Sequence, residues 1–302
     1  VYSKARGEFS LVKKRLVVNA DFKDSTERIE SRKFPANGSV RVEWDGDKNV
    51  LFSSPDIKTS FGDLNIDGSL KVNRSLDITI KGGITDIKQA REFTGLILRK
   101  KFKFPEIRGN GEAESHIFGD FAAPQVKSDF SMAQASFGEL DAEYAKGTIE
   151  LIKDDFFGRF DIEDPAFKGT VGLFTNPTET RVEILCERGE TGVVLPALGI
   201  SLPVHGRGSG SFEYMEKKDG TVFNGVFTGK DIEFAGQSLS NVYGRIKGDD
   251  DSVEFPELNF NLLGGRVEGN LFLNTSAENF NIDFKGKDID LSSISENLKG
   301  IF

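Results

Sequence analysis

The stretch VEFPELNFNLLGGRVEGNLFL, residues 253–273, decides the fold. On both sides of Gly264-Gly265, apolar residues recur at about every second position, with Glu, Asn or Arg between them. A period of two gives an extended strand one apolar and one wet face, and paired glycines are a turn signal. This stretch therefore predicts two strands joined by a glycine turn, with one face apolar.

The same alternation recurs along the chain, for example over residues 64–72 and 280–284. Glycines following Asp or Asn punctuate the runs as turn and bulge signals: Asp45-Gly46, Asp67-Gly68, Asp219-Gly220 and Asn224-Gly225. We therefore expect an all-β fold of roughly 20 to 25 strands. They should form a long, mostly antiparallel sheet with one or two short helices.

Helical periodicity is confined to two short stretches. Residues 85–101 predict an amphipathic helix with Thr85 or Asp86 as its N-cap and a basic last turn that suits the helix dipole. Residues 292–299 are a second, shorter candidate. The rest of the chain is expected to be strands and tight connections.

An internal repeat supports a modular sheet. The sequence LDITIKG at 76–82 is similar to FNIDFKG at 280–286, and a strand pair built around a glycine turn precedes each copy. No linker rich in Pro, Ser or Gly marks a boundary. We expect one continuous β-repeat array over residues 1–302.

Composition excludes several classes of function. The chain has 48 acidic and 39 basic residues, a formal net charge of −9, which argues against binding that depends on neutralising nucleic-acid phosphates. A single Cys186, with His116 and His205 far apart in sequence, can form neither an internal disulfide nor a Cys/His zinc site. The most apolar window, 193–204, is too short to span a membrane. We expect no catalytic site, no metal and no cofactor.

The closing segment resembles the AsmA-like repeat. That repeat has two strands, a Gly-Gly turn, a Gly-x-Leu-x-Leu strand, a further strand and a short D-L-x-x-L helix start, as do residues 239–296 here. The middle segment, IFGDFAAPQV at 117–126, is similar to the G-x-x-x-x-P-x-V strands of TamB-type proteins. The resemblance covers most of the chain loosely.

The resemblance implies a fold, a place and a function. AsmA/TamB-like proteins fold as a long sheet curved into an open, U-shaped groove, the β-taco, in the periplasm of diderm bacteria. Their groove is thought to carry phospholipid acyl chains between the inner and outer membranes, and TamB works with an outer-membrane barrel partner. By this resemblance the chain is an internal fragment, and the full-length protein would carry an inner-membrane anchor.

The inward rows of the strands are the candidate lipid-binding site. Burying one acyl methylene group away from water is favourable by about 0.8 kcal/mol. Moving an acyl chain of roughly sixteen carbons from a bilayer into water therefore costs about 12 kcal/mol. A continuous apolar groove offsets this cost because the chain stays in contact with hydrocarbon. The expected groove-lining residues are Leu76, Ile78, Ile80, Phe160, Ile162, Phe260, Leu262, Val267, Leu271, Leu273, Phe280, Ile282 and Phe284.

Two other hypotheses remain open at this stage. An apolar sheet face must be covered by a second sheet, by closure on itself or by a ligand. If the side chains fill one another's space as a dry core, the protein would be an extracellular or periplasmic β-repeat scaffold or adhesin. An enzyme acting on polysaccharide is the third hypothesis.

Overall fold

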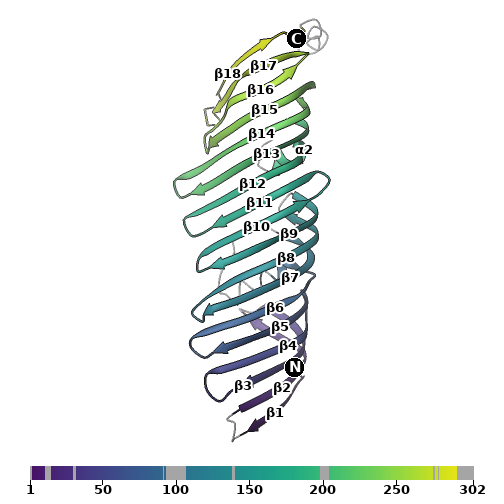
Figure 1. Cartoon of the computed structure of the whole chain (residues 1–302), viewed down its shortest axis with the longest axis vertical. Coiled ribbons are helices and arrows are strands. Elements are labelled where there is room, and N and C mark those ends of the chain that lie inside the picture. Colours follow the sequence, from purple (N-terminus) through teal and green to yellow (C-terminus); the bar gives the residue numbers. More distant parts are fainter. Residues whose placement is uncertain are drawn as a thin grey trace. The chain divides into compact units, whose positions relative to one another are not determined.

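The all-β prediction is confirmed by a computed structural model of the chain (Figure 1). The structure describes residues 2–10, 15–29, 32–90, 92, 107–137, 140–197, 204–234, 236–274, 276–277 and 279–290. Within these residues, eighteen strands form one antiparallel sheet that is not closed on itself. The strands are fewer than expected because most are long, up to 15 residues in β2, β8 and β14.

The chain divides into two compact units, Val1–Gly158 and Arg159–Phe302. The strands of the first unit are β1 (Tyr2–Ser10), β2 (Arg15–Ile29), β3 (Arg32–Trp44), β4 (Asn49–Thr59), β5 (Gly62–Lys71), β6 (Ser75–Ile84), β7 (Ile107–Asp120), β8 (Ala123–Phe137) and β9 (Leu140–Ile152). Each of them pairs antiparallel with the next in sequence.

Strand β10 (Asp155–Glu163) runs across the division between the units. The other strands of the second unit are β11 (Phe167–Thr175), β12 (Glu179–Glu190), β13 (Val204–Lys217), β14 (Gly220–Phe234), β15 (Gln237–Asp249), β16 (Ser252–Leu262), β17 (Gly265–Asn274) and β18 (Asn279–Lys287). From β11 onward each strand again pairs antiparallel with its successor. This nearest-neighbour order follows from the tight turns that the sequence predicts.

Aligned β-bulges bend the sheet in the second unit. The register shifts between Cys186 and Gly189 in β12, between His205 and Arg207 in β13, and between Ser240 and Tyr243 in β15. The first two irregularities lie on the paired strands β12 and β13, and the third lies on β15, beyond β14. A bulge bends its strand and increases the local twist, so a row of them curves the sheet along one line.

A structural repeat occurs three times, once more than the sequence predicts. At or just after the ends of β6, β12 and β18, a backbone amide donates a hydrogen bond to the turn before the preceding strand. The three bonds are Thr85 N to Phe61 O (2.9 Å), Glu190 N to Ala166 O (2.8 Å) and Asp290 N to Leu263 O (3.1 Å). The middle copy lacks the LDITIKG-like sequence, so only geometry identifies it.

The predicted helix at 85–101 is confirmed at its start. Residues 87–90 and 92 are helical, and Asp86 is the N-cap, because its carboxylate accepts a hydrogen bond from the Gln89 amide at 2.9 Å. The rest of that stretch and the candidate at 292–299 lie outside the described residues. No helix among the described residues is long and apolar enough to cross a membrane.

Helix α2 (Thr191–Ala197) was expected to be strand or loop, and that expectation is wrong. It contains Pro196 and has no apolar period to predict it. Tertiary contacts hold it instead: the Thr191 hydroxyl donates to Val204 O at 3.0 Å, and Val194 packs over Gly189. This short helix therefore lies against β12 and β13.

Candidate functional site

One face of the first unit is a largely apolar surface. Directly opposed residues of antiparallel strands point to the same side of a sheet, so the register identifies rows of side chains that cross the strands. One row crosses eight strands without a charge: Val18, Val42, Phe52, Gly68, Ile78, Ile117, Val126 and Leu151. The flanking row is Leu16, Trp44, Val50, Leu70, Leu76, Gly119 and Pro124.

The second unit has an equivalent surface over β11–β18. One row consists of Leu173, Val182, Tyr214, Phe223, Gly248, Val253, Leu273 and Phe280. Another consists of Gly169, Cys186, Gly210, Phe227, Gly244, Leu258, Gly269 and Phe284. Neither row contains a charged residue. In each unit, this apolar surface is called the apolar face below.

Glycine alternates with a larger side chain along the second of these rows, and this alternation makes the face smooth. A methyl group on Gly244 would overlap the Phe227 ring and lie 2.8 Å from Cδ2 of Leu258. A methyl group on Gly225 would lie 2.5 Å from Cδ1 of Phe212. The larger side chains therefore lie down over glycines of the neighbouring strands, the arrangement known as aromatic rescue of glycine.

The expected groove-lining residues of β6 and β16–β18 lie on the apolar faces, and Phe160 and Ile162 belong to β10. Their degrees of burial differ. Phe160, Ile162 and Val267 are buried. Those that are half-buried are Leu76, Ile78, Ile80, Phe260, Leu262, Leu271 and Leu273. On β18 the side chains of Phe280, Ile282 and Phe284 are 70%, 51% and 39% exposed. No large side chain among the described residues is completely buried.

Sequence reasoning missed much of this surface. Strands β2–β4 and β7–β9 contribute as much of the face as the predicted strand β6, and β13 and β14 contribute Phe212, Phe223 and Phe227. Their alternation is broken by glycines on the same face, such as Gly210 and Gly225. If glycine is counted as an apolar position, the alternation of these strands becomes visible in the sequence.

Charged side chains are gathered on the opposite face of the sheet. Cross-strand ion pairs there include Lys81 with Glu114 (2.8 Å) and Lys127 with Glu150 (3.0 Å) in the first unit, and Lys247 with Glu254 (2.9 Å) in the second. Exposed pairs of this kind contribute about 0 to 1 kcal/mol each. The charged side chains therefore matter mainly for their position: they lie on the solvated face and leave the apolar face without charge.

Three serine hydroxyl groups interrupt one row of the apolar face of the first unit. Ser54 on β4, opposite Ile66, is buried and donates to Ser39 O. Ser115 and Ser128 are directly opposed on β7 and β8, between Ile80 and Ile149, and their oxygens lie 2.7 Å apart. Each hydroxyl satisfies the other, which lowers the cost of placing them among apolar side chains. The face therefore remains uncharged at this point.

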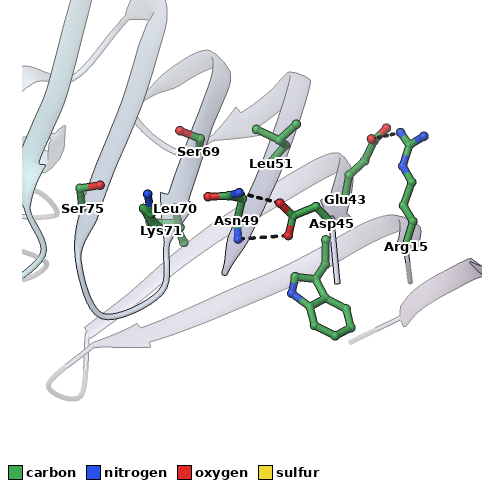
Figure 2. Close-up of a pocket in the computed structure, with 10 residues that line it drawn as sticks. Arg15, Glu43, Asp45, Asn49, Leu51, Ser69, Leu70, Lys71 and Ser75 are labelled. Carbon is green, nitrogen blue, oxygen red and sulfur yellow. Dashed lines mark hydrogen bonds and ion pairs between the residues drawn. The ribbon is translucent and has the colours of Figure 1, made fainter. Parts of the chain in front are cut away.

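A polar hollow of about 510 Å³ lies over the ends of β2–β6 (Figure 2). Arg15 and Arg41 both donate hydrogen bonds to Glu43, and these bonds lower the pKa of that carboxyl group. The amide of Asp47 and the side chain of Asn49 donate to Asp45 and lower its pKa below the ordinary aspartate value. Ser69, Leu70, Lys71 and Ser75 line the other side.

We expect the change Asp45→Asn to lower stability at neutral pH and to matter less in acid. A carboxyl group whose pKa is lowered by folding stabilises the protein above its unfolded pKa, and that stabilisation is lost as the pH falls through its folded value. The unfolding midpoint of the natural chain should therefore exceed that of the variant at pH 7, and the two should converge below about pH 4. Thermal melts followed by circular dichroism at both pH values measure this, and a difference that stays constant would contradict it.

The groups that could do chemistry are dispersed. Cys186 is buried on the apolar face, where burial raises the pKa of its thiol. His116 lies on the wet face, 2.8 Å from Asp77 and stacked on Phe118. The described residues contain no cluster of three or more His, Cys, Asp or Glu side chains that could hold a metal ion. Among the described residues, the apolar faces are the candidate binding surfaces.

Comparison with known proteins adds no relative to this description. No protein-family model matches the chain, and no curated protein or solved structure matches it.

Proposed function

We propose that this chain is a lipid-transfer segment of the AsmA/TamB kind, which acts without catalysing a reaction. Acyl chains of phospholipids or other acyl lipids lie along the apolar faces while the charged headgroup stays in water. The segment works in the periplasm, on lipids that move between the inner and outer membranes during cell-envelope biogenesis.

The observation that carries this proposal is an uncharged row of side chains that crosses eight strands and stays partly exposed on seven of them, from Val18 to Val126, while Leu151 on the eighth is buried. An apolar sheet face in a dry core would be sealed by a second layer packed against it. In the described part of each unit the strands pair with their neighbours in the sheet, and α2 lies against β12 and β13. Apolar area left in water costs about 25 cal/mol per Å², and an acyl chain on the face removes that cost.

The smoothness of the face supports movement as well as binding. Because large side chains lie down over glycines such as Gly244 and Gly269, the surface along the row has few steps. A bound methylene therefore meets hydrocarbon at each strand. The free energy of binding an acyl chain is therefore similar at each strand, and movement of the chain along the sheet requires such similarity.

Native mass spectrometry of the purified chain tests this proposal. We expect adducts with the masses of phospholipids, which disappear after delipidation and return when phospholipid vesicles are supplied. Lysophospholipid, with one acyl chain, should bind more weakly, because it buries about half the methylene groups. A chain that binds no lipid but binds a glycan or a protein would contradict the proposal and support the scaffold hypothesis.

A further inference from the structure

The sheet has two open edges, one at β1 and one at β18. Strand β1 pairs with β2, and β18 pairs with β17. Because the sheet is not closed on itself, no described strand pairs with the other side of β1 or of β18. The backbone N–H and C=O groups on these two sides are unpaired within the described sheet, and such an edge is a template for a strand of another molecule.

Strand β18 has the composition of an inner strand and the exposure of an edge strand. It contains no proline, it pairs with β17 without a bulge, and its apolar side carries no charge. All nine of its residues are exposed. In β6, whose other side is paired with β7, the equivalent residues Leu76, Ile78 and Ile80 are half-buried. A strand on the open side of β18 would therefore bury apolar side chains that β18 exposes.

The chain itself contains this kind of junction twice. The structural repeat ends at β6, β12 and β18, and the strands that follow β6 and β12 pair antiparallel with them. In both junctions the first residue of one strand faces the last residue of the next: Ser75 faces Asp120, and Glu179 faces Lys217. Strands β7 and β13 therefore indicate which kind of strand the open side of β18 can accept.

Strand β1 holds the same place in the repeat as β7 and β13. The strand after each of them, β2, β8 or β14, has 15 residues, and the next one, β3, β9 or β15, has 13. The repeat thus begins at β1, β7 and β13 and ends at β6, β12 and β18. A second copy of this chain can therefore offer its β1 to β18 in the way that β7 and β13 meet β6 and β12.

The register of the two existing junctions predicts how β18 pairs with β1 of a second copy. Asn279 faces Ser10 of the second copy, and Ile282 faces its Gly7. Gly7 lies opposite Val18, on the apolar face, so the apolar sides of the two strands point the same way. A methyl group on Gly7 would have its nearest neighbours at 3.5 Å, an ordinary contact. The space beside Gly7 is therefore open to Ile282, as larger side chains lie over glycines elsewhere on this face.

The charges of the two strands fit this register. Asp283 faces Arg6 of the second copy. Within its own sheet Asp283 lies opposite Asn270, and Arg6 lies opposite Asn19, so neither has a charged residue directly opposite. Directly opposed residues of unlike charge stabilise a pair of strands. The new pairing therefore gives each of these two residues an opposite charge.

The same register brings one pair of like charges together, because Lys285 faces Lys4 of the second copy. Each of these lysines already lies opposite an acidic residue in its own sheet, Glu268 for Lys285 and Asp21 for Lys4. These acidic residues offset the repulsion between the lysines. The remaining polar positions of the pairing bring no like charges into opposition.

We propose that copies of this chain associate head to tail, with β18 of one copy paired antiparallel with β1 of the next. The contact joins two different surfaces, so it generates a row of copies or a ring, and not a two-fold dimer. The apolar face at β18 then continues onto β1 of the next copy. The pairing uses backbone hydrogen bonds and needs no lipid, so this proposal and the lipid-transfer proposal can fail separately.

Disulfide formation between copies tests the register. All variants carry Cys186→Ala, which removes the natural thiol. Opposed residues of paired strands have Cα atoms about 4.5 to 5.5 Å apart, which a disulfide can bridge. Gly7→Cys with Ile282→Cys should therefore give covalently linked multimers under mild oxidation, seen on a gel without reductant. Glu8→Cys with Ile282→Cys is the matched control and should stay unlinked, because a shift of one residue along a strand reverses the face.

Sedimentation velocity over a range of concentrations tests the charges. The natural chain should form larger species as its concentration rises. Arg6→Glu and Asp283→Lys should each weaken association about tenfold, because an attraction becomes a repulsion. The chain that carries both changes should associate like the natural chain, since the opposite charges are restored in exchanged positions.

The proposal is overturned by a natural chain that stays single at every concentration, or by a doubly exchanged chain that associates no better than the single variants. Linked dimers of a chain with Ile282→Cys alone would also overturn it, because they would show that β18 pairs with β18. Equal linking of the Glu8→Cys control would show that the register is wrong. Loss of lipid adducts from a chain that still associates would instead contradict lipid transfer and leave the head-to-tail pairing standing.

Discussion

We expect phospholipid transfer between vesicles to fall at least about tenfold when Ile282 and Phe284 are both changed to Asp. Both side chains lie on the apolar face of β18, opposite Leu271 and Gly269. An acyl chain that passes two carboxylates must strip water from them, which costs several kcal/mol, and 1.4 kcal/mol already corresponds to a factor of ten. Aspartate is chosen because its short side chain cannot bend its charge away to water as lysine or arginine can.

The matched control for this variant adds the same charge to the other face of the same strand. Asn279 and Asn281 are exposed and point away from the apolar face, so Asn279→Asp with Asn281→Asp should leave transfer unchanged. The apolar-face variant should still fold, because Ile282 and Phe284 are 51% and 39% exposed. The change at Phe284 removes its edge-on contact with Phe260 at 5.9 Å, worth about 1 kcal/mol, and its cover of Gly269. Normal transfer by a folded Ile282→Asp, Phe284→Asp chain would show that lipid does not use this face.

The faces of these strands could be predicted because a period of two is a local property of the sequence. Phe280, Ile282 and Phe284 alternate with polar residues, and the register places them together with Leu273, Leu271 and Gly269. Strand type and the apolar side therefore follow from residues a few positions apart. The Asp86 N-cap could be predicted for the same reason, because a capping side chain acts within one turn of its own helix.

What could not be predicted depends on contacts between distant residues. Asp67-Gly68 and Asn224-Gly225 carry a turn signal, yet they lie inside β5 and β14. Gly68 lies beneath Phe52, and Gly225 lies beneath Phe212, so in both cases an aromatic ring from the neighbouring strand takes the space of the missing side chain. A glycine in a turn and a glycine under a ring look the same in sequence.

Helix α2 and the middle copy of the repeat were missed for a related reason. The helix is held by Thr191 and by the packing of Val194 over Gly189, and neither contact leaves a periodic pattern. The middle repeat is defined by one backbone hydrogen bond, Glu190 N to Ala166 O, which any pair of residues could make. Backbone geometry of this kind does not depend on side-chain identity.

Some glycines of the apolar face leave no room for a side chain, so they cannot be replaced without loss of stability. Gly82 and Gly83, which are neighbours in β6, allow this loss to be measured. A methyl group on Gly82 would overlap the Asp63 carbonyl oxygen and lie 3.0 Å from Cα of Leu64. Both obstacles are backbone atoms of the paired strand β5, which cannot move without breaking the ladder. A methyl group on Gly83, which points to the other face, would have Gly111 O as its nearest neighbour, at 3.9 Å.

We expect Gly82→Ala to destabilise the protein by about 3 kcal/mol, the upper range for overpacking, and to lower the Tm by about 6 °C or more. Gly83→Ala should instead stabilise it by about 0.4 to 1 kcal/mol, because alanine restricts the unfolded chain without meeting an obstacle. Thermal melts of both variants measure the difference, and each variant is the control for the other, since position, strand and chemical change are matched. Equal effects would mean that β5 and β6 do not approach closely at Gly82. Opposite effects would show that glycine is kept there because the two strands need its space, and that the smooth apolar face depends on small residues as much as on large ones.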